Sequence, residues 1–138
     1  MPRSYTTLTL AEAQRMLHAG EAAATRLGVA YNIAVVDAGG HLVAFARQDG
    51  ALVGSIDLAI GKAMTARSFD KPTSLLASLA QPGAPLFGIQ DTNSGRVVIF
   101  GGGLPVTSGG VIVGAVGASA GTIEQDIEVA EAAIAALA

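Results

Sequence analysis

No charged side chain occurs between Arg96 and Glu124, and this uncharged stretch constrains the fold more than any other part of the sequence. An apolar stretch of about 20 residues is long enough to span a bilayer as a helix. Here, however, glycines recur throughout the stretch and Pro105 interrupts it. Glycine and proline disfavour helix interiors by about 1 and about 3 kcal/mol. We therefore expect short buried strands in this stretch and no membrane span.

The apolar residues of this stretch gather into short β-branched runs. Val97–Phe100 and Val111–Val113 predict two buried strands, and Pro105–Thr107 predicts a third, shorter one. A helix is expected to follow, because Thr122 and Gln125 have the spacing of a capping box.

Glycine-rich segments lie before the third strand and before the last helix, and they are candidate ligand sites. The segment Gly117–Gly121 is expected to be a loop whose backbone N–H groups, with the helix N-terminus, favour an anion. The same glycines could equally serve only tight turns and close packing. The candidate ligand-binding residues are Gly101, Gly102, Gly103, Pro105, Ser119, Gly121 and Thr122.

The first half of the chain predicts a helix, a hairpin and two further helices. Thr9 and Glu12 form a second capping-box pattern, and Gly28 is a suitable C-cap. The expected elements are a helix from Thr9 to Gly28, strands over Val29–Val36 and His41–Arg47, and helices over Ser55–Phe69 and Thr73–Ala80.

Lys62 is the least ordinary charged residue, because Leu58, Ala66 and Phe69 surround it on one helix face. Such a lysine either extends its ammonium to solvent or pairs with a buried acid. A desolvated lysine could also have a lowered pKa and act as a base or nucleophile. If Lys62 pairs with an acid, Asp126 is the candidate counterpart, because apolar residues flank it on the last helix.

Three further polar residues are candidates for a site. Arg47 and Asp49 follow the hairpin and could bind a polar ligand, pair with each other or fix the loop. Asp49 joins Lys62 and Asp126 as a candidate acid–base residue. His18 lies on a flank of the first helix among small residues. It is either a solvated or interface histidine or a metal ligand.

The composition limits the classes of protein to which the chain can belong. A length of 138 residues predicts one domain, residues 1–138. Only 14% of the residues are charged, against about a quarter in typical proteins, so we expect some helix faces to be buried in a homo-oligomer. A net charge of −3 without a basic stripe disfavours nucleic-acid binding, and no cysteine is present. No signal-peptide pattern precedes the first helix, so a cytoplasmic location is expected.

Several strings in a fixed order resemble the GlcG/HbpS-like family and the C-terminal domain of PduO-type corrinoid adenosyltransferases. They are NIAVVDAGGHLVAFARQDGA, GGGLP and GVIVGAVGASAGTIEQD, with Ala59, Lys62-Ala63 and Thr65-Ala66 between the first two. The sequence departs from the family pattern at Gln48, where methionine is frequent, and at Ala120, where glycine is frequent. The resemblance implies an α+β, profilin-like fold of α/β/α layers with a five-stranded antiparallel sheet. It also implies homo-oligomers, built from dimers into tetramers or octamers, and a haem ligand held by His18.

Two functions of different classes follow. The first is a haem-binding or haem-handling protein, with haem as cofactor and His18 as iron ligand. The alternative is a cofactor-free isomerase, lyase or hydrolase that acts on a small carboxylate metabolite at a glycine-rich oxyanion site. A small-molecule sensor or assembly partner without chemistry is a third possibility.

Overall fold

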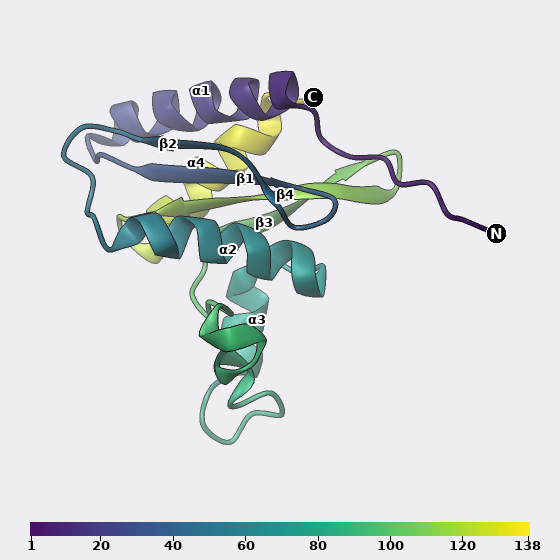
Figure 1. The fold of residues 1–138 in the computed structure, drawn as a ribbon. Helices are drawn as coiled ribbons and strands as arrows, with labels where there is room; N and C mark the ends of the chain where they lie inside the picture. Colours follow the sequence, from purple (N-terminus) through teal and green to yellow (C-terminus); the bar gives the residue numbers. More distant parts are fainter.

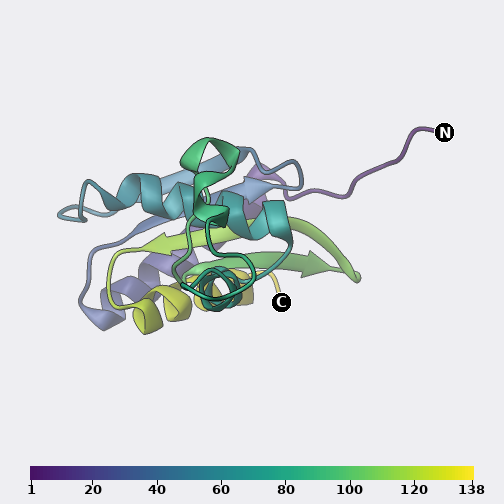
Figure 2. The same ribbon diagram turned by 90° about the horizontal axis from the view of Figure 1, so that it is seen from below.

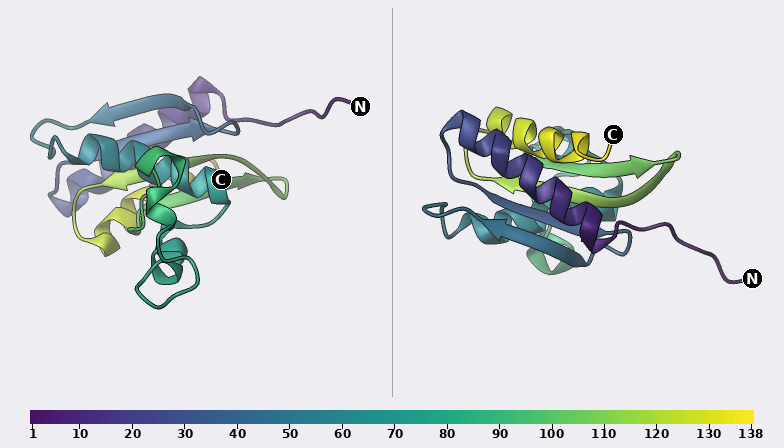
Figure 3. Two further views of the ribbon diagram at one scale, coloured as in Figure 1. Left: turned by 60° about the horizontal axis from the view of Figure 1, so that its bottom comes forward. Right: turned by 90° about the horizontal axis from the view of Figure 1, so that it is seen from above.

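In the computed structural model, which describes residues 1–138, helices cover both faces of one antiparallel sheet (Figure 1). Helices α1 and α4 lie side by side on one face, as the view from above shows (Figure 3), and α2 covers the other. The elements are α1 (Leu10–Leu27), β1 (Asn32–Asp37), β2 (Leu42–Arg47), α2 (Ser55–Phe69), α3 (Thr73–Leu79), the 3-10 turns η1 (Ile89–Asp91) and η2 (Asn93–Gly95), β3 (Gly103–Ser108), β4 (Val111–Ser119) and α4 (Ile123–Ala135).

The sheet has four strands in the order β2-β1-β4-β3, and every neighbouring pair is antiparallel. The two central strands, β1 and β4, are buried along most of their length. This explains why β1 is apolar at successive positions and lacks the alternation of a half-exposed strand.

The sheet faces are packed with side chains of different size. On the α1/α4 face, Met16, Tyr31 and Ile33 belong to a large apolar cluster. On the α2 face the buried cluster consists mostly of alanines, which let α2 approach closely. A Cβ atom at Gly117 would collide with the α2 backbone, including the amide nitrogen of Ala63 at 2.6 Å. Glycine is therefore required there because strand and helix backbones touch.

The predicted helix boundaries are confirmed. The Thr9 hydroxyl accepts a hydrogen bond from the Glu12 amide, and the Glu12 carboxylate accepts one from the Thr9 amide. Thr122 and Gln125 form the same reciprocal pair at the start of α4. Because each box satisfies two amides that have no partner within the helix, both helices begin at their first apolar residue.

One strand prediction and part of one loop prediction are wrong. Val97–Phe100 forms no strand, so the sheet has four strands where five were expected. This segment lies against α2 instead, where the amide of Val98 donates to the Thr65 hydroxyl at 2.9 Å. Residues 117–119, expected in a loop, are the end of β4, because each pairs with a residue of β1.

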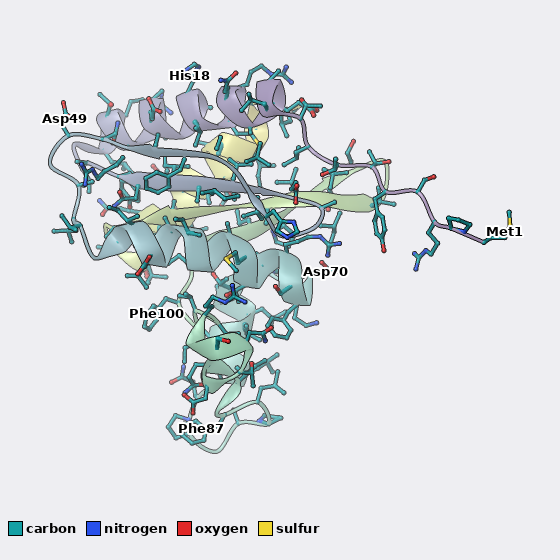
Figure 4. All side chains as sticks on the ribbon, viewed as in Figure 1. Met1, His18, Asp49, Asp70, Phe87 and Phe100 are labelled. Atoms are coloured by element: carbon teal, nitrogen blue, oxygen red, sulfur yellow. The ribbon has the colours of Figure 1, made fainter.

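The segment from α3 to η2 projects from the layered body as an arm (Figures 1 and 3), which Figure 2 shows end-on. We use "arm" for residues 73–95. Its tip carries Phe87, which is exposed and points away from the rest of the chain (Figure 4). None of the helices is both long enough and apolar enough to cross a bilayer.

Candidate functional site

His18 lies on the outer surface of α1, on the side that faces away from the sheet (Figure 4). Its imidazole makes no hydrogen bond or ion pair within the chain, so both ring nitrogens are free to bind a ligand. The helix packs through the opposite face, where Ala13, Met16 and Leu17 are buried. The amphipathic pattern of α1 thus places His18 in solvent.

The surroundings of His18 would leave room for a haem beside its imidazole. Ala22, one turn further along α1, is small and exposed, so it leaves space beside the imidazole. Arg15, almost one turn earlier, is exposed and has no ion-pair partner, and a guanidinium suits the carboxylate of a propionate. None of the five cavities of the chain is lined by His18. The His18 imidazole therefore lies on a convex surface, without a pocket around it.

The second polar cluster is buried and joins Lys62 to Asp126. The Lys62 ammonium donates to an Asp126 carboxylate oxygen at 2.7 Å and to the carbonyl of Ala118 at 3.0 Å. The Tyr31 hydroxyl and the Gly121 amide donate to the other carboxylate oxygen at 2.8 and 2.9 Å. Of the alternatives considered for Lys62, the structure shows pairing with a buried acid, and the acid is Asp126.

Burial sets the acid–base behaviour of this cluster. Desolvation lowers the pKa of Lys62, although the hydrogen bond and the charge of Asp126 oppose this effect. The pKa of Tyr31 is raised by burial first, and then by the hydrogen bond to Asp126 and the negative charge of that carboxylate. Both shifts follow from removal of the three side chains from water.

The three consecutive glycines cover this cluster. A Cβ atom at Gly102 would lie 2.8 Å from the carbonyl oxygen of Ala118 and 2.9 Å from the Lys62 ammonium. The carbonyl of Gly102 also accepts a hydrogen bond from the Ala118 amide at 3.0 Å. Gly102 thus lies directly against the ion pair, and no cavity is lined by Lys62 or Asp126.

The amides expected to hold a ligand anion are occupied by side chains of α4. The Gly121 amide donates to Asp126, and the Thr122 amide donates to Gln125. Pro105 lies within β3, opposite Ala115. The structure therefore brings the glycine-rich residues and Asp126 together, but the anion that they surround is the carboxylate of Asp126 itself and not a ligand.

Arg47, Ser119 and Asp49 are not part of that cluster. Arg47 and Ser119 lie on either side of Asn32 in the register of β2, β1 and β4. Asn32 is fully buried, donates to the carbonyl of Leu52 at 3.0 Å and has a side-chain oxygen without a partner. Asp49 is exposed beyond the end of β2. The three proposed acid–base residues therefore do not converge, since Asp49 lies apart from Lys62 and Asp126.

The sequence prediction missed two polar residues, Tyr31 and Asn32. A tyrosine within an apolar strand was a usable signal, because a buried tyrosine hydroxyl normally finds a hydrogen-bond partner. Asn32 in the same strand gave a similar signal, because strands are depleted in asparagine.

The fold and this geometry define a class of small α+β proteins: a four-stranded antiparallel sheet between helical layers, with a buried lysine–aspartate pair and a free histidine on the first helix. Residues 8–135 match the family described as "Haem degrading protein HbpS-like". The chain belongs to this family.

Two curated relatives and one solved structure extend this assignment. The chain is 47% identical over 128 residues to an uncharacterised 15.0 kDa protein of the dhaT-dhaS intergenic region of Citrobacter freundii, covering 93% of this chain and 90% of that protein. It is 39% identical over 131 residues to the corrinoid adenosyltransferase PduO of the same organism, covering 95% of this chain but only 39% of PduO. A crystal structure of a PduOC–haem complex is similar with a TM-score of 0.91 and 36% identity, covering 95% of each chain.

These similarities favour the hypothesis of a haem-binding protein over the hypothesis of a cofactor-free enzyme. The geometry agrees with that preference, because the proposed catalytic pair is enclosed and its hydrogen-bonding groups are engaged with the protein. The comparisons also confirm both resemblances seen in the sequence motifs, to the HbpS-like family and to PduO-type corrinoid adenosyltransferases.

Proposed function

We propose that this protein binds haem and that the His18 imidazole is the iron ligand. The observation that carries the proposal is the exposed imidazole of His18, which has no partner within the chain. Histidine is a common axial ligand of haem iron. Membership of the HbpS-like family and similarity to a haem complex support the same ligand.

The other residues near His18 would position the ligand. Ala22 leaves room for a flat ring system beside the imidazole. Arg15 offers a guanidinium to a propionate at the edge of that ring. Since one chain presents these groups on a convex surface, the exposed side of the haem would be covered by another copy.

The experiment is a hemin titration of the whole protein, followed by visible absorption. The wild type is compared with His18→Ala and with His41→Ala, which removes the only other histidine. His41 is a suitable control because its side chain is 86% exposed and lies in a turn outside the proposed site.

We expect a sharp Soret band that saturates at a fixed ratio of haem to chain in the wild type and in His41→Ala. His18→Ala should lose that band. A broad, non-saturating change that is equal in all three proteins would mean adsorption to apolar surface and would overturn the proposal.

A further inference from the structure

A groove of about 410 Å³ lies on the outer face of α2, between that helix and the segment that follows the arm. Its apolar wall consists of Leu58, Ile60, Met64 and Val98. The opposite face of α2 packs on the sheet. Sites for small molecules are clefts of about 300–1,000 Å³ with mostly apolar walls and a few polar groups. The groove therefore has the size and the lining of a site for one small molecule.

Two opposite charges border the groove, those of Asp57 and Arg96. Neither residue belongs to any of the three ion pairs of the chain. The Nε group of Arg96 donates to the carbonyl of Asn93 at 3.1 Å, which holds the guanidinium in place and leaves its Nη groups without a partner in the chain. The groove thus offers a carboxylate acceptor and a fork of N–H donors beside an apolar wall.

The backbone turn before Arg96 has an uncommon conformation. Asn93, Ser94 and Gly95 have φ angles of 54°, 59° and 73° in succession. Residues with a side chain seldom adopt this left-handed region, and where they do, a ligand site is often near. Gly95 itself lines the groove, and no atom lies within 4 Å of a Cβ atom built there, so the space beside Arg96 stays open. The turn therefore places Arg96 at the groove without closing it.

Charges of both signs select among the small molecules that the groove could hold. A simple carboxylate would be attracted by Arg96 but repelled by Asp57, and a simple amine would meet the reverse. A molecule that carries both groups satisfies both residues, because a guanidinium binds a carboxylate through paired N–H groups and a carboxylate accepts from an ammonium. The apolar wall favours a hydrocarbon side chain on the same molecule. Together these requirements describe an amino acid with an apolar side chain.

We propose that the groove on α2 binds a free amino acid with an apolar side chain, whose carboxylate contacts Arg96 and whose ammonium contacts Asp57. The lining of the groove includes no serine, threonine, lysine, histidine or cysteine, so the site has no nucleophile and is one for binding alone. The proposal is independent of haem binding, because His18 lies on α1, on the other side of the sheet (Figure 4).

A titration of the whole protein with L-leucine tests the proposal, and the NMR signals of the methyl groups in the apolar wall report binding. Isocaproate and isoamylamine are titrated in parallel, because each keeps the hydrocarbon part of leucine but lacks its ammonium or its carboxylate. The variants are Asp57→Asn and Arg96→Gln. Glu131→Gln and Arg26→Gln are the matched controls, because these exposed residues lie on α4 and α1, on the opposite side of the sheet.

We expect leucine to bind the wild type and both controls at least about tenfold more tightly than either analogue, since each analogue loses one charge-assisted contact and meets one charge of its own sign. Asp57→Asn should bind leucine about tenfold more weakly and should no longer discriminate against isocaproate. Arg96→Gln should show the same loss and should no longer discriminate against isoamylamine.

Three results would overturn the proposal. The first is the absence of methyl shifts up to the solubility limit of leucine. The second is an equal response of the wild type to leucine and isocaproate, which would mean that the ammonium contributes nothing. The third is a set of methyl shifts that appears when the protein concentration is raised without leucine, because a second copy would then cover the groove. The comparison of the three probes on the wild type decides the matter even if a variant fails to fold, which circular dichroism would show.

Discussion

The ammonium of Lys62 lies 2.7 Å from the carboxylate of Asp126, although the two residues come from helices on opposite faces of the sheet. Both side chains are almost completely buried. The ion pair therefore connects the α2 layer to the α4 layer beside the last residues of β4, with the carbonyl of Ala118 as a third participant. Loss of one partner would leave an uncompensated charge inside the protein.

Lys62→Met and Asp126→Asn should each destabilise the fold by about 3–5 kcal/mol, because each leaves the other charge buried alone. The double variant Lys62→Met/Asp126→Asn should cost less than the sum of the two single losses, because it removes both buried charges. The amide oxygen that it introduces can still accept from the Tyr31 hydroxyl and the Gly121 amide. Urea unfolding of the three variants measures these differences.

Asp70→Asn provides the control for this comparison. Asp70 pairs with Arg67, but that pair is partly exposed and should contribute at most about 1 kcal/mol. The variant keeps the hydrogen bond that Arg67 donates to the carbonyl of Ala38. Equal losses for Lys62→Met and Asp70→Asn would show that the buried pair has no special role in stability.

Tyr31→Phe should change how stability depends on pH above 10. In the folded protein, burial and Asp126 raise the pKa of Tyr31 above its ordinary value of 10.0. The unfolded chain loses that proton first, so the contribution of Tyr31 is complete below pH 10.0 and is lost as the pH rises above it. The wild type should therefore lose stability more steeply than Tyr31→Phe in this range.

Titration of Lys62 changes the stability in the opposite direction, so the effect of Tyr31 has to be measured as a difference between the wild type and Tyr31→Phe. Its pKa is lowered in the folded protein, so the unfolded chain binds the proton more tightly and stability rises with pH up to the ordinary value of 10.5. Since Lys62 is present in both proteins, the difference between their urea midpoints isolates Tyr31. Parallel pH profiles would contradict the role assigned to its hydroxyl.

Gly102→Ala should destabilise the protein by more than about 3 kcal/mol. The added methyl group would meet the Ala118 carbonyl and the Lys62 ammonium, and the φ angle of 121° is strained for any residue with a side chain. Gly109→Ala is the control, because its φ is also positive but no atom lies within 4 Å of the new methyl group. That variant should lose only about 1–2 kcal/mol. If both variants lost the same free energy of unfolding, contact between the new methyl group and the ion pair would contribute nothing to the loss at Gly102.

Local signals in the sequence were sufficient for the helices and for the buried ion pair. Capping boxes at Thr9 and Thr122 fixed two helix starts, because a cap depends only on residues three positions apart. The apolar neighbours of Lys62 made a buried acidic partner one of its possible interpretations, and the structure shows that this partner is Asp126. An interior lysine needs a counter-charge, and few acids in the sequence have apolar neighbours.

The errors concern groups whose partners are distant in the sequence. Val97–Phe100 has the composition of a strand, but the partner of its amides cannot be inferred from composition. Here the Val98 amide bonds to a threonine of α2. In the same way, the glycines before α4 had the pattern of an anion site, and the sequence could not show that Asp126 accepts from the Gly121 amide.

Thr65→Val should release the segment that was wrongly predicted to be a strand. Thr65 is buried, and its hydroxyl accepts from the Val98 amide at 2.9 Å. Valine has nearly the same shape but leaves that amide without an acceptor, which should cost about 1–3 kcal/mol. Hydrogen exchange at the Val98 amide should become faster. Exchange within β1 should change only as far as the global stability of the protein changes. Thr107→Val, at an exposed position of β3, is the control and should leave exchange at the Val98 amide unchanged. Faster exchange at Val98 in both variants would show that the Thr65 hydroxyl does not hold this segment.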